Sequence, residues 1–291
     1  MGPNIIDAAT RGFTPDNCWN RSFDAGTALN RIFKEIESPG IITNLAGTYY
    51  FKTPIVCYDK KIVCEANVIL YWMGDFNETL FTFGGSIGGK NVGADKSHLS
   101  GIYLVGDSKI PGCTGFVFKN QSFSRFSIEV ADCDVAFLQW ADDWATKHHA
   151  YFNTLYGCVS HNCRTALKTS GINTTANIQP QSSTLRIDSM DVSGVCDVLF
   201  DLGEGANCCA FRNISYQTSA KNPIIVRTGK LAGGCSSIDL QYFETKGNKG
   251  QVIWNNDNNI LSLNNVYDVI QVIDNGKNNR LVKPDNAEKG G

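Results

Sequence analysis

The sequence predicts an all-β protein: a right-handed single-stranded parallel β-helix (a solenoid) with a short N-terminal capping helix. Three observations predict it. Short apolar runs alternate with period two, they recur at intervals of 23–32 residues, and one amphipathic helical segment stands near the start of the chain. Glycine, asparagine, serine and aspartate fill the intervals between the runs, as turns require.

The helical segment comes first in the chain. It carries apolar residues at helical spacing: Leu29, Ile32, Phe33 and Ile36. Asp24 or Thr27 is available as its N-cap, and Pro39 with Gly40 ends it. One amphipathic helix ahead of a solenoid would cover the open end of its core, as terminal caps must.

The repeat follows the helix. The central residues of the apolar runs are separated by 24, 27, 32, 27, 26 and 23 residues, and a second run follows each after a similar interval. These central residues are Leu104, Ile128, Leu155, Ile187, Ile214, Leu240 and Leu263. A β-sandwich would instead need tight turns about every 8–12 residues. We therefore expect seven stacked coils, with these residues aligned about 4.8 Å apart along the axis.

This reading divides the chain into four parts. They are an N-terminal segment (1–22), the capping helix with the first strands (23–50), the parallel β-helix (51–275) and a polar C-terminal tail (276–291).

Composition excludes several classes of protein. Hydrophobic content of 42% and charged content of 19% indicate a globular chain. A net charge of −2 without a basic stripe argues against a nucleic-acid partner. No apolar run is long enough for membrane insertion, and no Lys- or Arg-led apolar leader opens the chain, so we expect no signal peptide.

Eleven cysteines are scattered along the chain. A chain of this length can bury a core without a disulfide framework, so we interpret them as reduced thiols that act as small buried apolar residues.

The capping helix, the runs "AGTYYF" and "KIVCEANVILYW" and the irregular coils after them resemble the start of the pectate-lyase-like β-helix superfamily. Within it, the likeness over roughly residues 23–275 is to bacteriophage tailspike and depolymerase proteins. The resemblance implies a homotrimer on the virion tail, made in the host cytoplasm and acting outside the cell. It also implies binding, and often cleavage, of a bacterial surface polysaccharide.

Neighbours of inward-pointing residues point outward and stack in columns. The positions after the seven central residues are Val105, Glu129, Tyr156, Asp188, Ser215, Gln241 and Asn264, and those before them are Tyr103, Ser127, Thr154, Arg186, Asn213, Asp239 and Ser262. Such a polar face with an aromatic side chain suits sugars. We predict substrate binding by Tyr156, Arg186, Asn213 and Asp239.

Two carboxylates, Glu129 and Asp188, fall two coils apart in one expected column, about 9–10 Å at the backbone. Inverting glycosidases hold their acid and base about 6.5–9.5 Å apart. Asp132 and Asp191 stand three residues after these two carboxylates. The predicted catalytic set is therefore Glu129, Asp132, Asp188 and Asp191; the alternative is that all four are solvated surface carboxylates.

The segment "QWADDWATKHHAYF" places Trp140 and Trp144 in a polar excursion, where we predict further glycan contacts. The alternatives are a subunit interface, and a metal or proton-transfer site at His148, His149 and the adjacent aspartates.

We predict no cofactor and no metal. "CVSHNC" offers Cys158, His161 and Cys163 but lacks a second ligand pair for zinc. The glycine-rich residues 83–93 lack the Lys-Ser/Thr and the helix of a phosphate loop.

Three functions remain open. They are a tailspike that hydrolyses a host polysaccharide, a non-enzymatic viral adhesin or structural spike of the same architecture, and a polysaccharide lyase. The lyase ranks last, because Arg186 and Arg212 have no acidic calcium-binding cluster in the same column.

Overall fold

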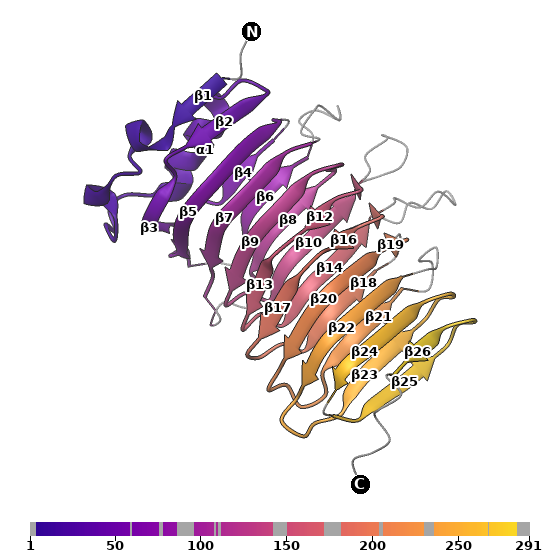
Figure 1. Ribbon diagram of the computed structural model, residues 1–291. Coiled ribbons are helices and arrows are strands. Elements are labelled where there is room, and N and C mark those ends of the chain that lie inside the picture. Colours follow the sequence, from indigo (N-terminus) through magenta and orange to yellow (C-terminus); the bar gives the residue numbers. More distant parts are fainter. Residues whose placement is uncertain are drawn as a thin grey trace.

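The structure, a computed structural model, describes residues 4–58, 60–75, 78–85, 96–107, 109, 112–141, 150–171, 182–203, 206–229, 236–266 and 268–283. Within these residues the protein is mostly β-strand, with one α-helix. Figure 1 shows the strands side by side, crossing a long axis that runs from the N-terminal to the C-terminal end.

The strands form three sheets. The 14-stranded sheet contains β1 (Asn4–Asp7), β2 (Gly40–Thr43), β3 (Ala46–Phe51), β5 (Ile62–Trp72), β7 (His98–Val105), β9 (Arg125–Ala131), β12 (Thr154–Leu155), β13 (Cys158–His161), β16 (Arg186–Ile187), β17 (Met190–Ser193), β20 (Ala210–Gln217), β22 (Ser237–Glu244), β24 (Ile260–Val266) and β26 (Arg280–Val282). The nine-stranded sheet contains β4 (Ile55–Cys57), β6 (Thr79–Gly84), β8 (Thr114–Lys119), β10 (Val135–Ala141), β14 (Thr165–Gly171), β18 (Val198–Leu202), β21 (Ile224–Thr228), β23 (Gly250–Trp254) and β25 (Ile270–Asp274). The three-stranded sheet contains β11 (Ala150–Tyr151), β15 (Ser182–Ser183) and β19 (Ala206–Asn207).

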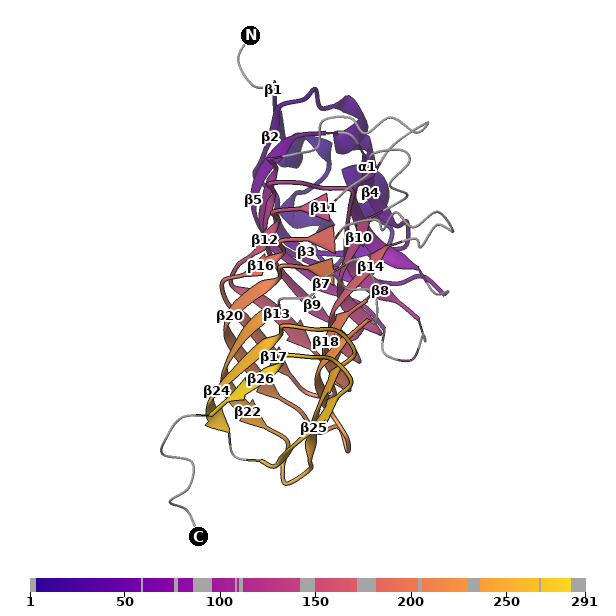
Figure 2. The ribbon, with the colours of Figure 1, turned by 90° about the vertical axis from the view of Figure 1, so that its right-hand side faces the viewer.

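Every pairing between these described strands is parallel, which excludes the antiparallel hairpins of a sandwich. From β5 onward the chain alternates between the two long sheets, and each return places a strand beside its predecessor. We call one such passage a winding. In Figure 2 the two long sheets face each other, with the short strand β11 between them.

The expected helix is confirmed as α1 (Ala25–Glu35), with two short 3-10 turns, η1 (Ala8–Arg11) and η2 (Pro15–Asn17), before it. Asp24 is the N-cap, and its side chain accepts a hydrogen bond from the Gly26 amide at 3.2 Å. Its apolar side is buried, and Phe33 lies 5.9 Å from Phe81 between ring centroids. The helix lies at the N-terminal end of the sheets in Figure 1, beside β3 and β4.

Large aromatic side chains make up much of the core between the sheets. Phe81, Phe116 and Phe137 stack on successive windings, and Phe81 and Phe116 pack edge to face at 5.3 Å. Cysteines fill smaller gaps nearby. Eight of them are buried, as predicted.

A buried polar ladder runs beside this core, one residue before the strands of the 14-stranded sheet. The Ser97 hydroxyl accepts from the Ile62 amide at 3.0 Å, and the Ser124 hydroxyl accepts from the Ser97 amide at 3.1 Å. Asn153 Oδ1 then accepts from the Ser124 amide at 3.2 Å. Each side chain thus satisfies a backbone donor of the previous winding, as a buried N–H requires.

The predicted alignment of the seven central residues is only partly correct. Leu155 pairs with Ile187, and Leu240 pairs with both Ile214 and Leu263, as expected. The other three expected pairs are wrong: Leu104 pairs with Val130, Leu155 with Phe126, and Ile187 with Phe211.

The cause is a corner in the 14-stranded sheet, where the number of residues changes from one winding to the next. The register shifts between Ser100 and Ile102 against β9, with Gly101 at φ +69°. It shifts again after Phe211 in β20, where Asn213 has φ +54°. Such bulges re-aim the side chains that follow them. The columns on the outer surface therefore differ from those predicted.

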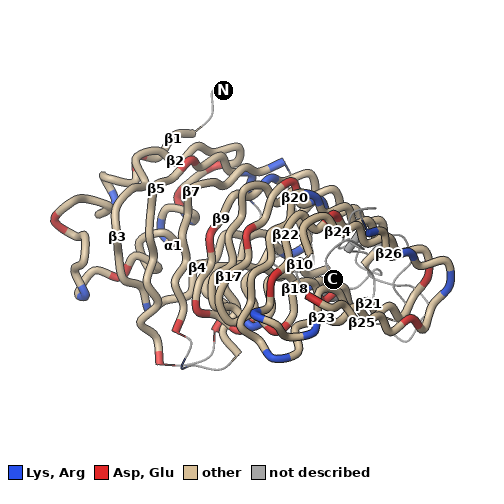
Figure 3. The backbone as a smooth tube through the Cα atoms, turned by 60° about the horizontal axis from the view of Figure 1, so that its bottom comes forward, with Lys and Arg blue, Asp and Glu red and all other residues tan. Residues whose placement is uncertain are grey.

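Within the described residues, no helix is long and apolar enough to span a membrane. Acidic and basic residues both occur along the whole length of the molecule, as Figure 3 shows.

Candidate functional site

The first part of the candidate site is a column of outward residues that includes two arginines. His98 pairs with Arg125, Arg125 with Thr154, and Thr154 with Arg186. Arg125 and Arg186 are exposed, and His98 is half-buried. We call His98, Arg125, Thr154 and Arg186 the cationic column. Of its members, sequence reasoning identified only Arg186 as a binding residue.

Tyr156 is fixed against this column. Its hydroxyl lies 2.9 Å from His98 Nε2, and the Arg125 guanidinium lies 5.0 Å from the centre of its ring. Burial raises the pKa of the Tyr156 hydroxyl, so the phenol keeps its proton and can donate it to the imidazole. Tyr156 is half-exposed on this surface, whereas its role in substrate binding stays a prediction.

Two phenylalanines that sequence reasoning missed border the cationic column. Phe123 and Phe152 stack with ring centroids 5.1 Å apart and an interplanar angle of 11°. They are 54% and 46% exposed. Each precedes a member of the buried polar ladder, Ser124 and Asn153 respectively, and we call the pair the aromatic edge.

The carboxylates lie in a different column from the one predicted. Glu129 pairs with Val159, and Val159 pairs with Asp191, so Glu129 and Asp191 stand two strands apart on one face, about 9.6 Å at the backbone. Both are exposed. Asp188 is not in this column: it follows Ile187, whose register partner is Leu155, so Asp188 stands next to Tyr156.

Asp132 belongs to a turn rather than to that face. It has φ +56°, and its amide donates to the His161 carbonyl oxygen at 3.0 Å. With Cys133, Asp134, Asn162, Arg164 and Val195 it lines a cavity of about 370 Å³. Burial raises the pKa of Tyr103, and the charges of Glu129 and Asp132 raise it further. Both carboxylates therefore lie near the Tyr103 ring, although Asp132 belongs to the turn and Glu129 to the strand β9.

The remaining predicted sugar contacts are placed as follows. Asn213 is exposed at the corner, and its amide donates to the Asp188 carbonyl oxygen at 3.4 Å. Asp239 accepts hydrogen bonds of 2.7 Å from both Gln241 and Asn264, which occupies both of its carboxylate oxygens.

The described part of the tryptophan segment does not lie on the surface that holds the cationic column. Trp140 lies in β10 of the nine-stranded sheet, in register with Lys119, and is half-buried. Trp144, His148 and His149 lie outside the described residues.

A second aromatic cluster lies towards the N-terminal end and was also missed. Tyr50 pairs with Tyr71, and Trp19, 60% exposed, lies 6.0 and 5.7 Å from their ring centres. The Arg21 guanidinium stands 5.3 Å from the Tyr50 ring.

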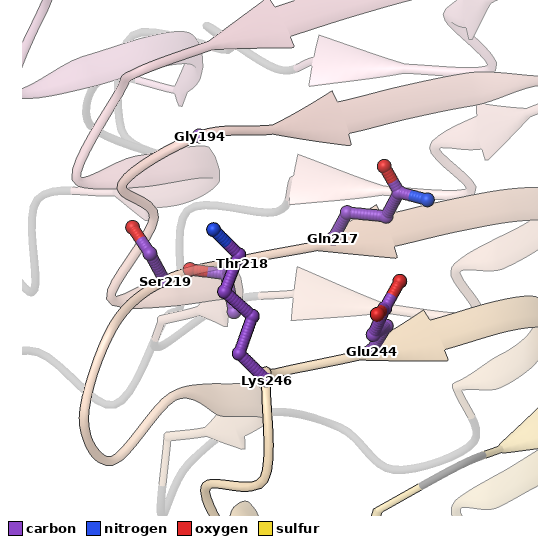
Figure 4. A pocket seen from close by; sticks show the side chains of 6 residues that line it. All are labelled: Gly194, Gln217, Thr218, Ser219, Glu244 and Lys246. Carbon is purple, nitrogen blue, oxygen red and sulfur yellow. The ribbon is translucent and has the colours of Figure 1, made fainter.

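The cavity shown in Figure 4 is smaller, about 220 Å³. It lies where β20 and β22 end, and is lined by Gly194, Gln217, Thr218, Ser219, Glu244 and Lys246. In Figure 4 the side chains of Gln217, Glu244 and Lys246 come from two adjacent windings.

The described residues hold no group of three His, Cys, Asp or Glu side chains arranged for a metal ion. Cys158 and Cys163 are buried whereas His161 is exposed, so these three do not converge. Most of the glycine-rich residues 83–93 lie outside the described part of the chain.

Comparison with known proteins finds no matching protein-family model and no matching curated sequence.

Proposed function

We propose that this chain is a tailspike-like protein that binds a polysaccharide on the surface of a bacterium. One observation carries the proposal: aromatic, cationic and carboxylate side chains form neighbouring columns on the outer side of the 14-stranded sheet, the first two before its corner and the carboxylates after it. A polymer of repeating sugars can meet such a surface at several windings in succession.

The fold that accompanies the proposal is a right-handed single-stranded parallel β-helix with α1 as its cap. It is supported by the parallel pairing and by the alternation of the chain between two long sheets. Connections between parallel strands are right-handed in about 98% of cases. A homotrimer carried on a virion is part of the same proposal, and sedimentation equilibrium at several protein concentrations tests the trimer.

The binding proposal is tested with an array of bacterial capsular polysaccharides and O-antigens. We expect the wild type to bind at least one of them. Tyr156→Ala should weaken binding because it removes the ring, whereas Tyr156→Phe should retain most of it. Tyr58→Ala, an exposed tyrosine after β4, is the matched control. Absence of binding to every polysaccharide would overturn the proposal.

Hydrolysis is the second candidate function, and the column that contains Glu129 and Asp191 favours it. Their backbone separation of about 9.6 Å is close to the range of about 6.5–9.5 Å between the carboxyl groups of inverting glycosidases. In such a mechanism one carboxylic acid protonates the leaving oxygen, and the other carboxylate activates a water.

The test is the release of reducing ends from whichever polysaccharide binds. Glu129→Gln and Asp191→Asn should each abolish release, while Asp188→Asn, in another column, should leave it largely intact. If the wild type releases no reducing ends, the protein is a binding protein only. A rise in absorbance near ~235 nm would instead indicate eliminative cleavage by a lyase.

A further inference from the structure

Two guanidinium groups of the cationic column are available to a ligand. Among the residues that the structure describes, neither Arg125 nor Arg186 forms an ion pair with a carboxylate. By contrast, Arg227 forms a bidentate pair with Asp201, at 3.0 and 2.7 Å. Within the described part of the chain, two exposed arginines on one face therefore lack a carboxylate partner.

Their spacing is set by the strands. Arg125 and Arg186 each pair with Thr154, so they stand two strands apart, about 9.6 Å at the backbone. This separation is comparable to one disaccharide unit of an extended polysaccharide. The planar guanidinium binds carboxylates through two parallel hydrogen bonds, which gives orientation as well as attraction.

The aromatic edge lies beside these arginines and holds an unfavourable backbone conformation. Phe123 and Phe152 have φ values of +57° and +54°. The left-handed region costs roughly 1–2 kcal/mol for an ordinary L-residue, and asparagine tolerates it best after glycine. The equivalent positions of other windings also have positive φ, whether the residue is Lys96, Thr184, Cys208, Asn258 or Asn278, so the conformation belongs to the turn before each strand. This turn holds both exposed rings beside the cationic column.

Carboxylates of the protein limit where a negative ligand can lie. Asp188 is exposed next to Tyr156, and Glu129 and Asp191 form the column beyond it. They repel an anion from that side. The favourable strip for a negative charge therefore runs along the cationic column, between the aromatic edge and the carboxylates.

We propose that this surface selects an acidic polysaccharide, one whose sugar carboxylates bind Arg125 and Arg186 while sugar rings lie against Phe123, Phe152 and Tyr156. This inference rests on the proposed function and names its substrate class. Carboxylate groups on alternate sugars fit the spacing of the two arginines.

The experiment compares acidic and neutral members of the polysaccharide array, and adds each bound acidic polysaccharide after chemical reduction of its carboxyl groups to alcohols. Wild-type protein should bind acidic members, and carboxyl reduction should abolish binding. Arg125→Gln and Arg186→Gln should each weaken binding by about tenfold to a hundredfold, as loss of a charged hydrogen bond implies.

Arg280→Gln is the matched control. Arg280 is an exposed arginine of β26, where it pairs with Ile260, several windings from Arg186. Binding should be unchanged in this variant, and all three variants should melt at the wild-type temperature. Raising the salt concentration should weaken binding of the wild type more than that of Arg125→Gln, because exposed charges are screened.

The outcomes separate the two proposals. Binding of neutral polysaccharides only, or binding that survives carboxyl reduction, overturns the acidic-ligand inference and leaves the binding function standing. Equal affinity of Arg125→Gln, Arg186→Gln and wild type also overturns it. Failure to bind any polysaccharide refutes the proposed function itself.

Discussion

Replacing Asn153 with alanine should destabilise the protein by about 3–5 kcal/mol, because the change orphans buried hydrogen-bonding groups. Asn153 is fully buried, and its Oδ1 accepts from the Ser124 amide at 3.2 Å. Its amide donates to the Gln121 carbonyl oxygen at 2.7 Å and to Gln139 Oε1 at 3.2 Å.

The magnitude follows from which partners have a substitute. The Gln121 carbonyl oxygen still accepts from the Tyr151 amide at 3.2 Å, so its loss costs about 1 kcal/mol. Among the described residues the Ser124 amide and Gln139 Oε1 have no other hydrogen-bond partner, and each orphaned group costs about 1–2 kcal/mol, the lower part of the usual range. Gln139 Nε2 is already a buried donor without an acceptor among the described residues, so the network offers no spare partner for the orphaned groups.

Thermal unfolding of the variants, followed by near-ultraviolet circular dichroism at one scan rate, measures the effect. In a chain of this size 1 kcal/mol corresponds to roughly 2 °C, so Asn153→Ala should lower the melting temperature by about 6–10 °C. Asn153→Ser should lose about half as much, since Ser97 and Ser124 show that a hydroxyl can serve the ladder. Asn264→Ala, an exposed control with a single bond to Asp239, should change little. A melting temperature for Asn153→Ala within about 2 °C of wild type would refute the reasoning.

Three further predictions concern the corner, the helix cap and the thiols. Gly101→Ala should cost at least about 2 kcal/mol in urea unfolding, because φ is +69° and the added Cβ would clash with the Ala66 carbonyl oxygen. Unchanged stability would contradict the clash. Burial raises the pKa of Asp24, but hydrogen bonds from two threonine hydroxyls and two amides lower it more, to a net value below the ordinary one. The stabilisation from its ionised carboxylate is therefore complete above the unfolded pKa of about 3.9 and is lost as pH falls through the lower folded pKa. The stability advantage of wild type over Asp24→Asn should shrink between pH ~5 and pH ~2. A pH-independent difference would count against this. Iodoacetamide at pH ~8 should alkylate the exposed Cys208 in the native protein but spare Cys158, because burial raises the pKa of the Cys158 thiol to about 12. Peptide mass mapping measures both. Rapid labelling of Cys158 would contradict its burial.

The period of the repeat and the capping helix could be predicted from the sequence, because both leave local signals. The helix has an apolar stripe with an Asp24 cap, and short apolar runs separated by turn residues predict parallel strands of nearly constant spacing. The register could not be predicted. Alternation with period two looks the same after a shift of two residues, so Ile128 served as well as Phe126 as a neighbour of Leu155.

The outer surface was predicted in part for the same reason. Arg186, Glu129 and Asp191 face outward whichever apolar neighbour is chosen, since alternation alone decides the face. Which carboxylates share a column depends on the residue count at the corner, and so Asp188 was paired wrongly with Glu129. The aromatic edge left a usable signal: Phe123 precedes Ser124 as Asn258 precedes Asn259, immediately before a strand in each case.

The corner of the 14-stranded sheet lets the exposed residues vary in number while the buried residues keep their positions. Strands on either side of it return to the same columns even though Gly101 or Asn213 adds a residue in some windings and not in others. Residues can therefore be inserted or removed there without disturbing the packing behind them. A library randomised in length as well as in composition between Leu155 and Cys158 would change the exposed side chains while the same framework persists, which makes this corner a natural place to engineer new binding surfaces.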